Sequence, residues 1–310
     1  MADILSIRGR IEALKFKHSQ SDDVTEKTVI HNVINVYAEL YAQYGIDVVY
    51  KIPDDKIFLS NFESHTFSQF NEDGITEKIF DTIGFTNKVY LEFGGTATNN
   101  NTEILHKKHG FTGVLFNCDD TECEYTKIHT ERVTAENIVS LCEKYELPKE
   151  FDFLSIDIDH NDWYVFRAIC SVYRPRVVVI EYNAHYAPPD DRVVVYDADI
   201  VPGITTYHGA TIESMYKLGR NLGYNLVAAE STGYNLFFVR DDIAPDAFYG
   251  TNDTFKLYRT PKLGHRPCGE NDSHTDECLK TYRLDGICGH KAPDGPVVWT
   301  NVQSLSEYVK

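Results

Sequence analysis

The sequence predicts an α/β fold, a three-layer sandwich around a doubly wound, mostly parallel sheet that ends in an antiparallel hairpin. Short apolar runs alternate with amphipathic helical segments from residue 89 onward, which is the pattern of βαβ units. The run VVVI at residues 177–180 is apolar at every position, as expected for a parallel strand covered on both faces. Two later strand-like runs are separated only by residues 231–233, and so short a link permits only an antiparallel hairpin.

The predicted elements follow in order along the chain. The runs VYLEF at 89–93, NTEILHKKHG at 101–110 and GVLFNC at 113–118 predict a strand, a helix and a second strand. The next helix spans 134–147 and opens at Thr134, whose hydroxyl suits an N-cap. The remaining elements are a strand at 152–158, a helix at 161–173, a strand at 177–182, a helix at 211–223 and the hairpin strands at 224–230 and 234–240.

Composition divides the chain into three parts. Residues 1–60 are expected to form a helical preface, because the apolar residues of VIHNVINVYAELYAQYG fall on one helical face. Residues 61–245 are expected to form the core. Residues 246–310 are rich in Gly, Pro, His and Cys and are expected to form a polar appendage.

Charge and hydropathy exclude several kinds of partner. Acidic residues outnumber basic ones 47 to 30, and a net charge of −17 repels nucleic-acid phosphates, so we expect no nucleic-acid partner. No apolar run approaches the roughly 20 residues that span a bilayer, and the N-terminus lacks a signal-peptide core. We therefore expect a cytoplasmic protein without a membrane partner, whose oligomeric state the sequence does not define.

The seven cysteines indicate reduced thiols or metal ligands and not a disulfide framework, because their number is odd and no secretory signal precedes them. The appendage carries six potential zinc ligands: His265, Cys268, His274, Cys278, Cys288 and His290. Its cysteines are ten residues apart and form no CxxC pair, so free thiols and surface histidines are the alternative to a structural zinc site.

Ligands of doubly wound sheets bind outside the carboxyl ends of the strands, so the residues there are the candidates for a site. Glu92, Gly94 and Gly95 end the first predicted strand, and the glycines let the backbone approach a ligand closely. Asp119 follows the second strand, where a ribose-binding acid is common. The alternatives are a simple tight turn at the glycines and a solvated acidic loop around Asp119.

Carboxylates and an amide crowd the ends of the next two predicted strands. Asp157, Asp159 and Asp162 lie within SIDIDHNDWY, and Glu181 and Asn183 follow the neighbouring strand. Carboxylates this close repel one another unless a cation or a hydroxyl-rich ligand lies among them, or Asp162 caps a helix. Oxygen ligands suit Mg²⁺ or Mn²⁺, so the candidate metal ligands are Asp157, Asp159, Glu181 and Asn183. Hydrogen bonding to substrate hydroxyls is the alternative.

Three histidines, His160, His185 and His208, lie in loops on the same predicted face. A loop histidine is a possible proton acceptor near neutral pH, although it is more often a plain surface residue.

Several blocks between residues 67 and 240 together resemble the FkbM-like family of class I, Rossmann-like S-adenosylmethionine-dependent methyltransferases. They are FSQFNEDGITEKIF, YLEFGG, VTAENI, DFLSIDIDHNDWYVF, PRVVVIEYN and GYNLVAAESTGYNLFFVR. The resemblance implies that the cofactor S-adenosylmethionine lies across the ends of the first two strands, beside Glu92, Gly94 and Gly95. It also implies that the segment with Gln69 and Asp73 folds over the cofactor.

The sequence departs from this family at two places. Residues 96–98 read Thr-Ala-Thr where relatives usually carry an Asp-Gly pair, and Asn117 stands at the position of the second-strand acid. Asp119 is then the residue expected to bind the ribose hydroxyls.

The resemblance implies an S-adenosylmethionine-dependent O-methyltransferase, and its expected partner is a small-molecule or glycan acceptor, preferably a hydroxyl of a nucleotide-linked sugar or a glycan. A divalent cation, Mg²⁺ or Mn²⁺, would lower the pKa of the attacked hydroxyl, and Asp159, His185 and His160 are the candidate catalytic residues. The alternative is a non-catalytic sugar- or cation-binding protein that retains the fold. A dehydrogenase or epimerase is disfavoured because no GxGxxG follows the first strand.

Overall fold

The computed structural model describes residues 55–96, 99–118, 124–200, 208–243, 246–259 and 261, together with the backbone of 299–300. All of them belong to one compact unit, Asp55–Lys310. The predicted helical preface lies outside the described residues up to position 54, and so does the whole cluster of potential zinc ligands.

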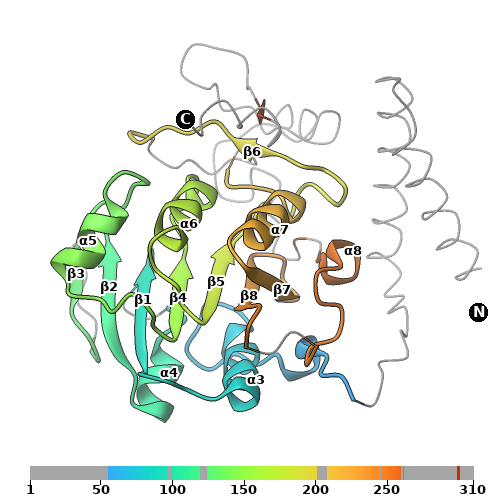
Figure 1. Ribbon diagram of the computed structural model, residues 1–310, viewed down its shortest axis with the longest axis horizontal. Helices are drawn as coiled ribbons and strands as arrows, with labels where there is room; N and C mark the ends of the chain where they lie inside the picture. The colour runs from blue at the N-terminus through green and yellow to red at the C-terminus, as the bar shows by residue number, and fades with distance from the viewer. Residues whose placement is uncertain are drawn as a thin grey trace, which may run out of the picture. The chain divides into compact units, whose positions relative to one another are not determined.

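A mixed seven-stranded sheet with the order β3-β2-β1-β4-β5-β8-β7 forms the middle layer (Figure 1). Its strands are β1 (Val89–Phe93), β2 (Thr112–Asn117), β3 (Ile128–Thr130), β4 (Phe153–Ile156), β5 (Val177–Glu181), β7 (Tyr224–Ala229) and β8 (Asn235–Arg240). The five neighbouring strands β3, β2, β1, β4 and β5 pair in parallel, whereas β8 is antiparallel to both β5 and β7. The predicted α/β sheet with a closing antiparallel hairpin is confirmed.

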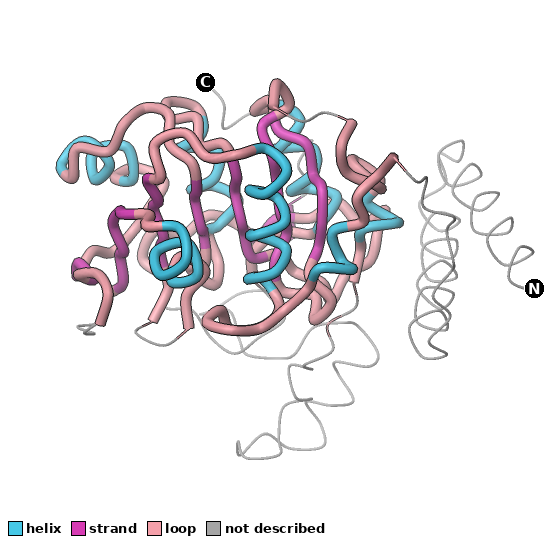
Figure 2. Tube along the Cα trace, turned by 90° about the horizontal axis from the view of Figure 1, so that it is seen from below, coloured by secondary structure: helices cyan, strands magenta, loops and turns pink. Residues whose placement is uncertain are grey.

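Helices cover both faces of this sheet (Figures 1 and 2). One face carries α5 (Ile138–Lys144), α6 (Asp162–Cys170) and α7 (Ile212–Asn221), which pack in sequence against one another. The other carries α3 (Glu72–Ile83) and α4 (Glu103–His109). Short helices η1 (Leu59–Phe62) and α8 (Thr254–Leu257) complete the helical elements of the described residues.

Two hydrophobic clusters hold the three layers together, and β1, β2, β4, β5, β7 and β8 each contribute to both. Successive side chains of a strand point to opposite faces. In β5, Val178 and Ile180 therefore join the cluster under α5, α6 and α7, while Val177 and Val179 join the cluster under α3 and α4. All four are fully buried, which is why this stretch of sequence has no polar position.

Helix α3 has no counterpart among the predicted elements, and two further details differ from the sequence-based expectation. Helix α5 begins at Ile138 and not at Thr134, because Thr134 and Asn137 first close a turn in which each side chain accepts a hydrogen bond from the backbone N–H of the other (3.3 and 2.8 Å). Strand β3 has no counterpart among the predicted elements, since its three residues, IHT, are too few to show a period.

The long connection between β5 and α7 contains a short strand, β6 (Val193–Val194), which pairs antiparallel with β9 (Trp299–Thr300). The Tyr164 hydroxyl donates to the Val194 carbonyl (2.8 Å) and ties the connection to α6. The first part of the predicted appendage also contacts the core, because the Tyr258 hydroxyl donates to the Ala184 carbonyl (2.7 Å). In the described part of the chain, no helix has the length and apolar character needed to cross a bilayer.

A buried ion pair fixes the end of the sheet opposite to the carboxyl ends of the parallel strands. Asp152, just before β4, accepts hydrogen bonds from the guanidinium of Arg176 (2.9 Å), from the backbone N–H groups of Thr86 and Lys88 and from the Thr86 hydroxyl. Burial alone would raise the pKa of Asp152, but the bonds from Thr86 and Arg176 outweigh it and hold the pKa below its ordinary value. The pair joins the start of β5 to the loop after α3.

We expect Asp152→Asn to lower the free energy of unfolding by about 3–5 kcal/mol, because it leaves the Arg176 charge buried without a counter-charge. The measurement is urea unfolding followed by circular dichroism. The matched control is Glu150→Gln, which breaks the pair of Arg240 with a largely exposed carboxylate and should cost at most about 1 kcal/mol. Equal losses in the two variants would contradict the structural role of the buried pair.

Candidate functional site

A polar cleft lies at the carboxyl ends of β1 and β4. The residues that line it are Gln69, Glu72, Glu92, Gly94, Gly95, Thr96, Asn99, Asn100, Asn101, Asp157 and Asn235. Three of them are carboxylates and five are amides, and none of these described lining residues is a lysine or arginine. The cleft is therefore suited to a ligand that carries positive charge and hydrogen-bonding groups.

Glu92 organises the loop that follows β1. One carboxylate oxygen accepts from the backbone N–H of Asn101 (2.7 Å), and the other accepts from the backbone N–H of Thr102 (3.1 Å) and from the Thr102 hydroxyl. The side chain is almost completely buried, and this burial raises its pKa to about 7 in spite of the three hydrogen bonds.

Gly94 and Gly95 are constrained by neighbouring protein atoms. Gly94 has a φ of +83°, and a Cβ atom there would lie 1.6 Å from the backbone carbonyl oxygen of Asp157. A Cβ atom at Gly95 would lie 3.0 Å from the carboxyl group of Glu92. From the sequence we expected these glycines to let the backbone approach a ligand. In the structure, the backbone of Gly94 instead approaches the backbone of Asp157, directly after β4.

The segment before and within the first turn of α3 reaches the same cleft. Gln69 and Glu72 line it, and Glu72 accepts hydrogen bonds from the backbone N–H of Phe70 (2.9 Å) and from the Asn235 amide (2.8 Å). Burial is the main cause that raises the pKa of Glu72. Asp73 instead holds the loop itself, because one of its oxygens accepts three hydrogen bonds from the backbone N–H groups of residues 66–68.

The end of β2 contributes Asn117, whose amide donates to the Gly95 carbonyl (3.0 Å) and so supports the wall of the cleft. Asp119, the predicted ribose-binding residue, lies outside the described residues, as do Ala97 and Thr98.

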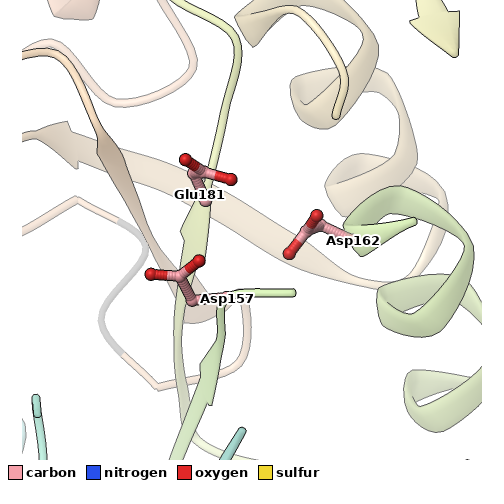
Figure 3. A group of neighbouring side chains, drawn as sticks. All are labelled: Asp157, Asp162 and Glu181. Atoms are coloured by element: carbon pink, nitrogen blue, oxygen red, sulfur yellow. The ribbon is translucent and has the colours of Figure 1, made fainter. Parts of the chain in front are cut away.

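A second group of carboxylates, which we call the acidic triad, consists of Asp157, Asp162 and Glu181. One oxygen from each lies within 4.8 Å of the others, and Figure 3 shows the three carboxyl groups around a shared space. Asp157 follows β4, Asp162 begins α6 and Glu181 ends β5. Burial, followed by the charges of neighbouring carboxylates, raises the pKa of Asp157 and of Glu181 well above the ordinary range. Burial also raises the pKa of Asp162 to about 7.

His208 lies beside the acidic triad, His185 lies next to His208, and Asn183 holds the segments that carry both histidines. The His208 ring nitrogen Nδ1 lies 3.8 Å from a carboxylate oxygen of Glu181, and the rings of His185 and His208 meet edge to face at 6.2 Å. The Asn183 side chain accepts from the backbone N–H of His185 (3.1 Å) and donates to the backbone carbonyl of His208 (2.9 Å). Both ends of this buried amide therefore serve the loop framework.

The other two sequence candidates occupy the turn between β4 and α6. Asp159 is exposed and has a φ of +64°, and its negative charge contributes to the raised pKa values of the acidic triad. His160 is buried, with 4% of its surface exposed. Neither residue belongs to the acidic triad.

Some residues of the site were not selected from the sequence. Glu72 and Asn235 reach the cleft from elements far apart in the chain, and no local pattern brings them together. Asp162 was noted as one of three crowded carboxylates but was left out of the metal ligands in favour of Asp159 and Asn183. The helical position of Asp162 was the available signal, because the first turn of α6 faces the strand ends.

No protein-family model matches the sequence, and no curated protein matches it. Among solved structures, a hemolysin candidate from Lactococcus lactis is 12% identical, with a TM-score of 0.35 and coverage of 55% of this chain and 86% of that one. The N-terminal domain of EvdMO1, solved with S-adenosylhomocysteine and D-fucose, is 12% identical, with a TM-score of 0.32 and coverage of 53% and 79%. The 1,6-didemethyltoxoflavin-N1-methyltransferase of Burkholderia thailandensis, solved with S-adenosylhomocysteine, is 13% identical, with a TM-score of 0.32 and coverage of 67% and 87%. Similarities at this level assign neither a cofactor nor an activity to this chain.

We expect Gly94→Ala to lower the free energy of unfolding by about 3 kcal/mol or more, because the new methyl group combines a left-handed backbone with a collision against β4. Gly110→Ala is the matched control, since Gly110 has a φ of +69° with no atom within 4 Å of the added Cβ, and it should cost about 1–2 kcal/mol. Urea unfolding of both variants provides the comparison. A Gly94→Ala variant as stable as the control would contradict the close approach to Asp157.

Proposed function

We propose that this protein is an S-adenosylmethionine-dependent methyltransferase that methylates a hydroxyl group of a sugar. The strand order, with antiparallel β8 inserted between β5 and β7, is the topology expected for class I methyltransferases and supports this proposal. In such sheets, ligands bind beyond the carboxyl ends of the parallel strands, which is where the cleft and the acidic triad lie.

The position of Asp157 is the observation that carries the proposal. Asp157 lines the polar cleft and also belongs to the acidic triad. A cofactor in the cleft and an acceptor beside the acidic triad would therefore be immediate neighbours. Methyl transfer needs such an arrangement, because donor and acceptor must meet in line.

The residues of the cleft fit S-adenosylmethionine, whose sulfonium and amino groups are positively charged. Glu72, Glu92 and Asp157 supply negative charge, and the amides of Gln69 and Asn99 offer hydrogen bonds to its polar groups. When bound, the cofactor supplies a methyl group whose bond to sulfur breaks, with the electron pair left on sulfur, as the acceptor oxygen forms the new bond to carbon.

The chain must also take the proton that the acceptor hydroxyl loses. His185 is half-buried and lies next to His208, which itself approaches Glu181. We assign His185 as the general base, because a neutral imidazole accepts a proton near pH 7. His160 and Asp159 occupy the neighbouring turn and are the other candidates from the same loops.

A sugar acceptor is supported by the surroundings of the acidic triad. Carboxylates and imidazoles there can bind several hydroxyl groups at once. The stacked rings of Phe70 and Tyr234, with centroids 4.6 Å apart, add apolar surface. Burial, followed by the charges of Glu181 and Glu230, raises the pKa of the Tyr234 hydroxyl.

Mass spectrometry of a panel of nucleotide-linked sugars, incubated with isotope-labelled S-adenosylmethionine, tests the activity. We expect one sugar to gain a labelled methyl group and His185→Ala to slow this transfer by about a hundredfold or more, because the proton acceptor is lost. The same variant should bind the cofactor in calorimetry within about twofold of the native affinity, since His185 does not line the cleft.

The matched control is His109→Ala, at the far end of α4, which should keep full turnover. Cofactor binding without transfer to any sugar hydroxyl would contradict the enzymatic proposal and favour a binding protein. Full turnover of His185→Ala would contradict its role as the base.

The affinity for S-adenosylmethionine should rise with pH around neutrality. Below pH 7 the carboxyl group of Glu92 is mostly protonated, because its pKa is raised to about 7, and above that pH it attracts the cationic cofactor. We expect a gain of roughly threefold to tenfold in affinity between about pH 6 and pH 8, measured by calorimetry.

Glu92→Gln should flatten this profile in part, since Glu72 and Asp157, whose pKa values are also raised, remain in the cleft. An unchanged profile in that variant would show that Glu92 does not control cofactor binding.

A further inference from the structure

The acidic triad has an unusual electrostatic environment. Asp162 is completely buried and Glu181 is 8% exposed, and Asp157 stands beside them. None of the three forms an ion pair with a lysine or arginine among the described residues, and the His208 ring lies 3.8 Å from Glu181. Two buried carboxylates and a half-buried third without a cation cost far more than paired ones.

Two of the carboxylate oxygens accept no hydrogen bond. The Asp162 oxygen Oδ1 accepts a hydrogen bond from the backbone N–H of Ile158 (2.8 Å), but its Oδ2 is buried and has no hydrogen-bond partner. The Oε2 atom of Glu181 is also buried without a hydrogen-bond partner. Buried polar atoms are nearly always satisfied in native proteins, so two such atoms within one cluster of carboxylates indicate a place for a ligand.

The carboxylates are held by rigid elements. Asp157 continues β4, Glu181 belongs to β5, and these strands pair in register in the middle of the sheet. Asp162 is the first residue of α6, and its bond to Ile158 fixes the orientation of its carboxyl group. Ligands from two strands and a helix that converge on one space form a preorganised site (Figure 3).

We propose that Asp157, Asp162 and Glu181 together bind one divalent cation, Mg²⁺ or Mn²⁺. A set made only of carboxylate oxygens selects hard cations over Zn²⁺ or Cu²⁺, which prefer nitrogen and sulfur. The three oxygens, at most 4.8 Å apart, leave further coordination positions for water or for acceptor oxygens.

This ligand set differs from the one expected from the sequence. The side-chain amide of Asn183 accepts a hydrogen bond from the backbone of His185 and donates one to the backbone of His208. Asp159 is exposed in the turn after β4. Asp162 takes their place because the first turn of α6 points its carboxyl group at the strand ends. Asn183 is then a positioning residue for the two histidine segments.

The role of the ion in catalysis rests on the proposed function, whereas its binding is a property of this site alone. Because Asp157 also lines the cleft, a cation here lies beside the proposed cofactor. Such an ion would bind two vicinal hydroxyl groups of an acceptor and favour ionisation of the attacked one. The preferred acceptors are therefore sugars with a free vicinal diol.

Mn²⁺ binding to the full chain tests the site without any turnover. Electron paramagnetic resonance and calorimetry should detect one strong Mn²⁺ site per chain, and Mn²⁺ should raise the thermal midpoint. Glu181→Gln and Asp162→Asn keep the shape of the side chains and should each weaken Mn²⁺ at least about tenfold, because each removes a charged ligand. Asp159→Asn is the matched control, with the same loss of charge in the adjacent turn, and should change the affinity less than about threefold.

Circular dichroism of each variant checks that it is folded, and Glu181→Gln provides a second test if Asp162→Asn unfolds. Equal Mn²⁺ affinity in native protein and folded Glu181→Gln would overturn the proposed site. A strong Mn²⁺ site in a chain that does not bind S-adenosylmethionine would support this site and refute the methyltransferase. Loss of Mn²⁺ binding in Asp159→Asn equal to that in Glu181→Gln would also overturn it, since the effect would then be one of general charge.

Discussion

Carboxylates from α3, β1, β5 and α6 and from the end of β4 gather at the carboxyl ends of the parallel strands. Removing them from water costs free energy, and the surrounding structure must hold them in place against this cost. After burial, the charges of Asp159, Asp162, Glu92 and Glu72 all raise the pKa of Asp157. A flexible framework would let such groups move apart or turn to solvent. The parallel sheet, covered on both faces, prevents this because its strand ends cannot separate without exposing two hydrophobic clusters.

The structure deals with these charges in two ways. Glu92 and Glu230 accept hydrogen bonds on both carboxylate oxygens, from backbone N–H groups and from hydroxyls, and each of them holds a loop in shape. Asp162 and Glu181 each keep a buried oxygen that accepts no hydrogen bond. The first kind of carboxylate is part of the framework, and the second kind is available to a ligand. Burial alone does not separate the two kinds, since members of both are almost completely enclosed.

Most of the fold could be predicted from the sequence, because periodicity and short links report local structure directly. The strands from β1 to β8 with clear apolar runs were located, and residues 231–233 predicted the hairpin. Strand β3 was missed, because pairing with β2 defines it and not its own composition. In the site, Glu92, Asp157 and Glu181 could be predicted because ligands of such sheets bind at the carboxyl ends of the strands. It could not find Asn235 or Glu72, whose meeting depends on how α3 packs against β8.

Gly94 shows that a glycine can be required for reasons unrelated to any ligand. Its missing side chain makes room for the backbone carbonyl of Asp157, so the spacing of β1 and β4 depends on it. A descendant of this protein that had lost every ligand would still keep glycine at this position in order to fold. Among distant relatives, a surviving Gly-Gly pair after the first strand is therefore poor evidence of retained activity. The sheet does not need Asp157 and Glu181 for its own packing. Whether a relative retains these two carboxylates is therefore better evidence of retained activity.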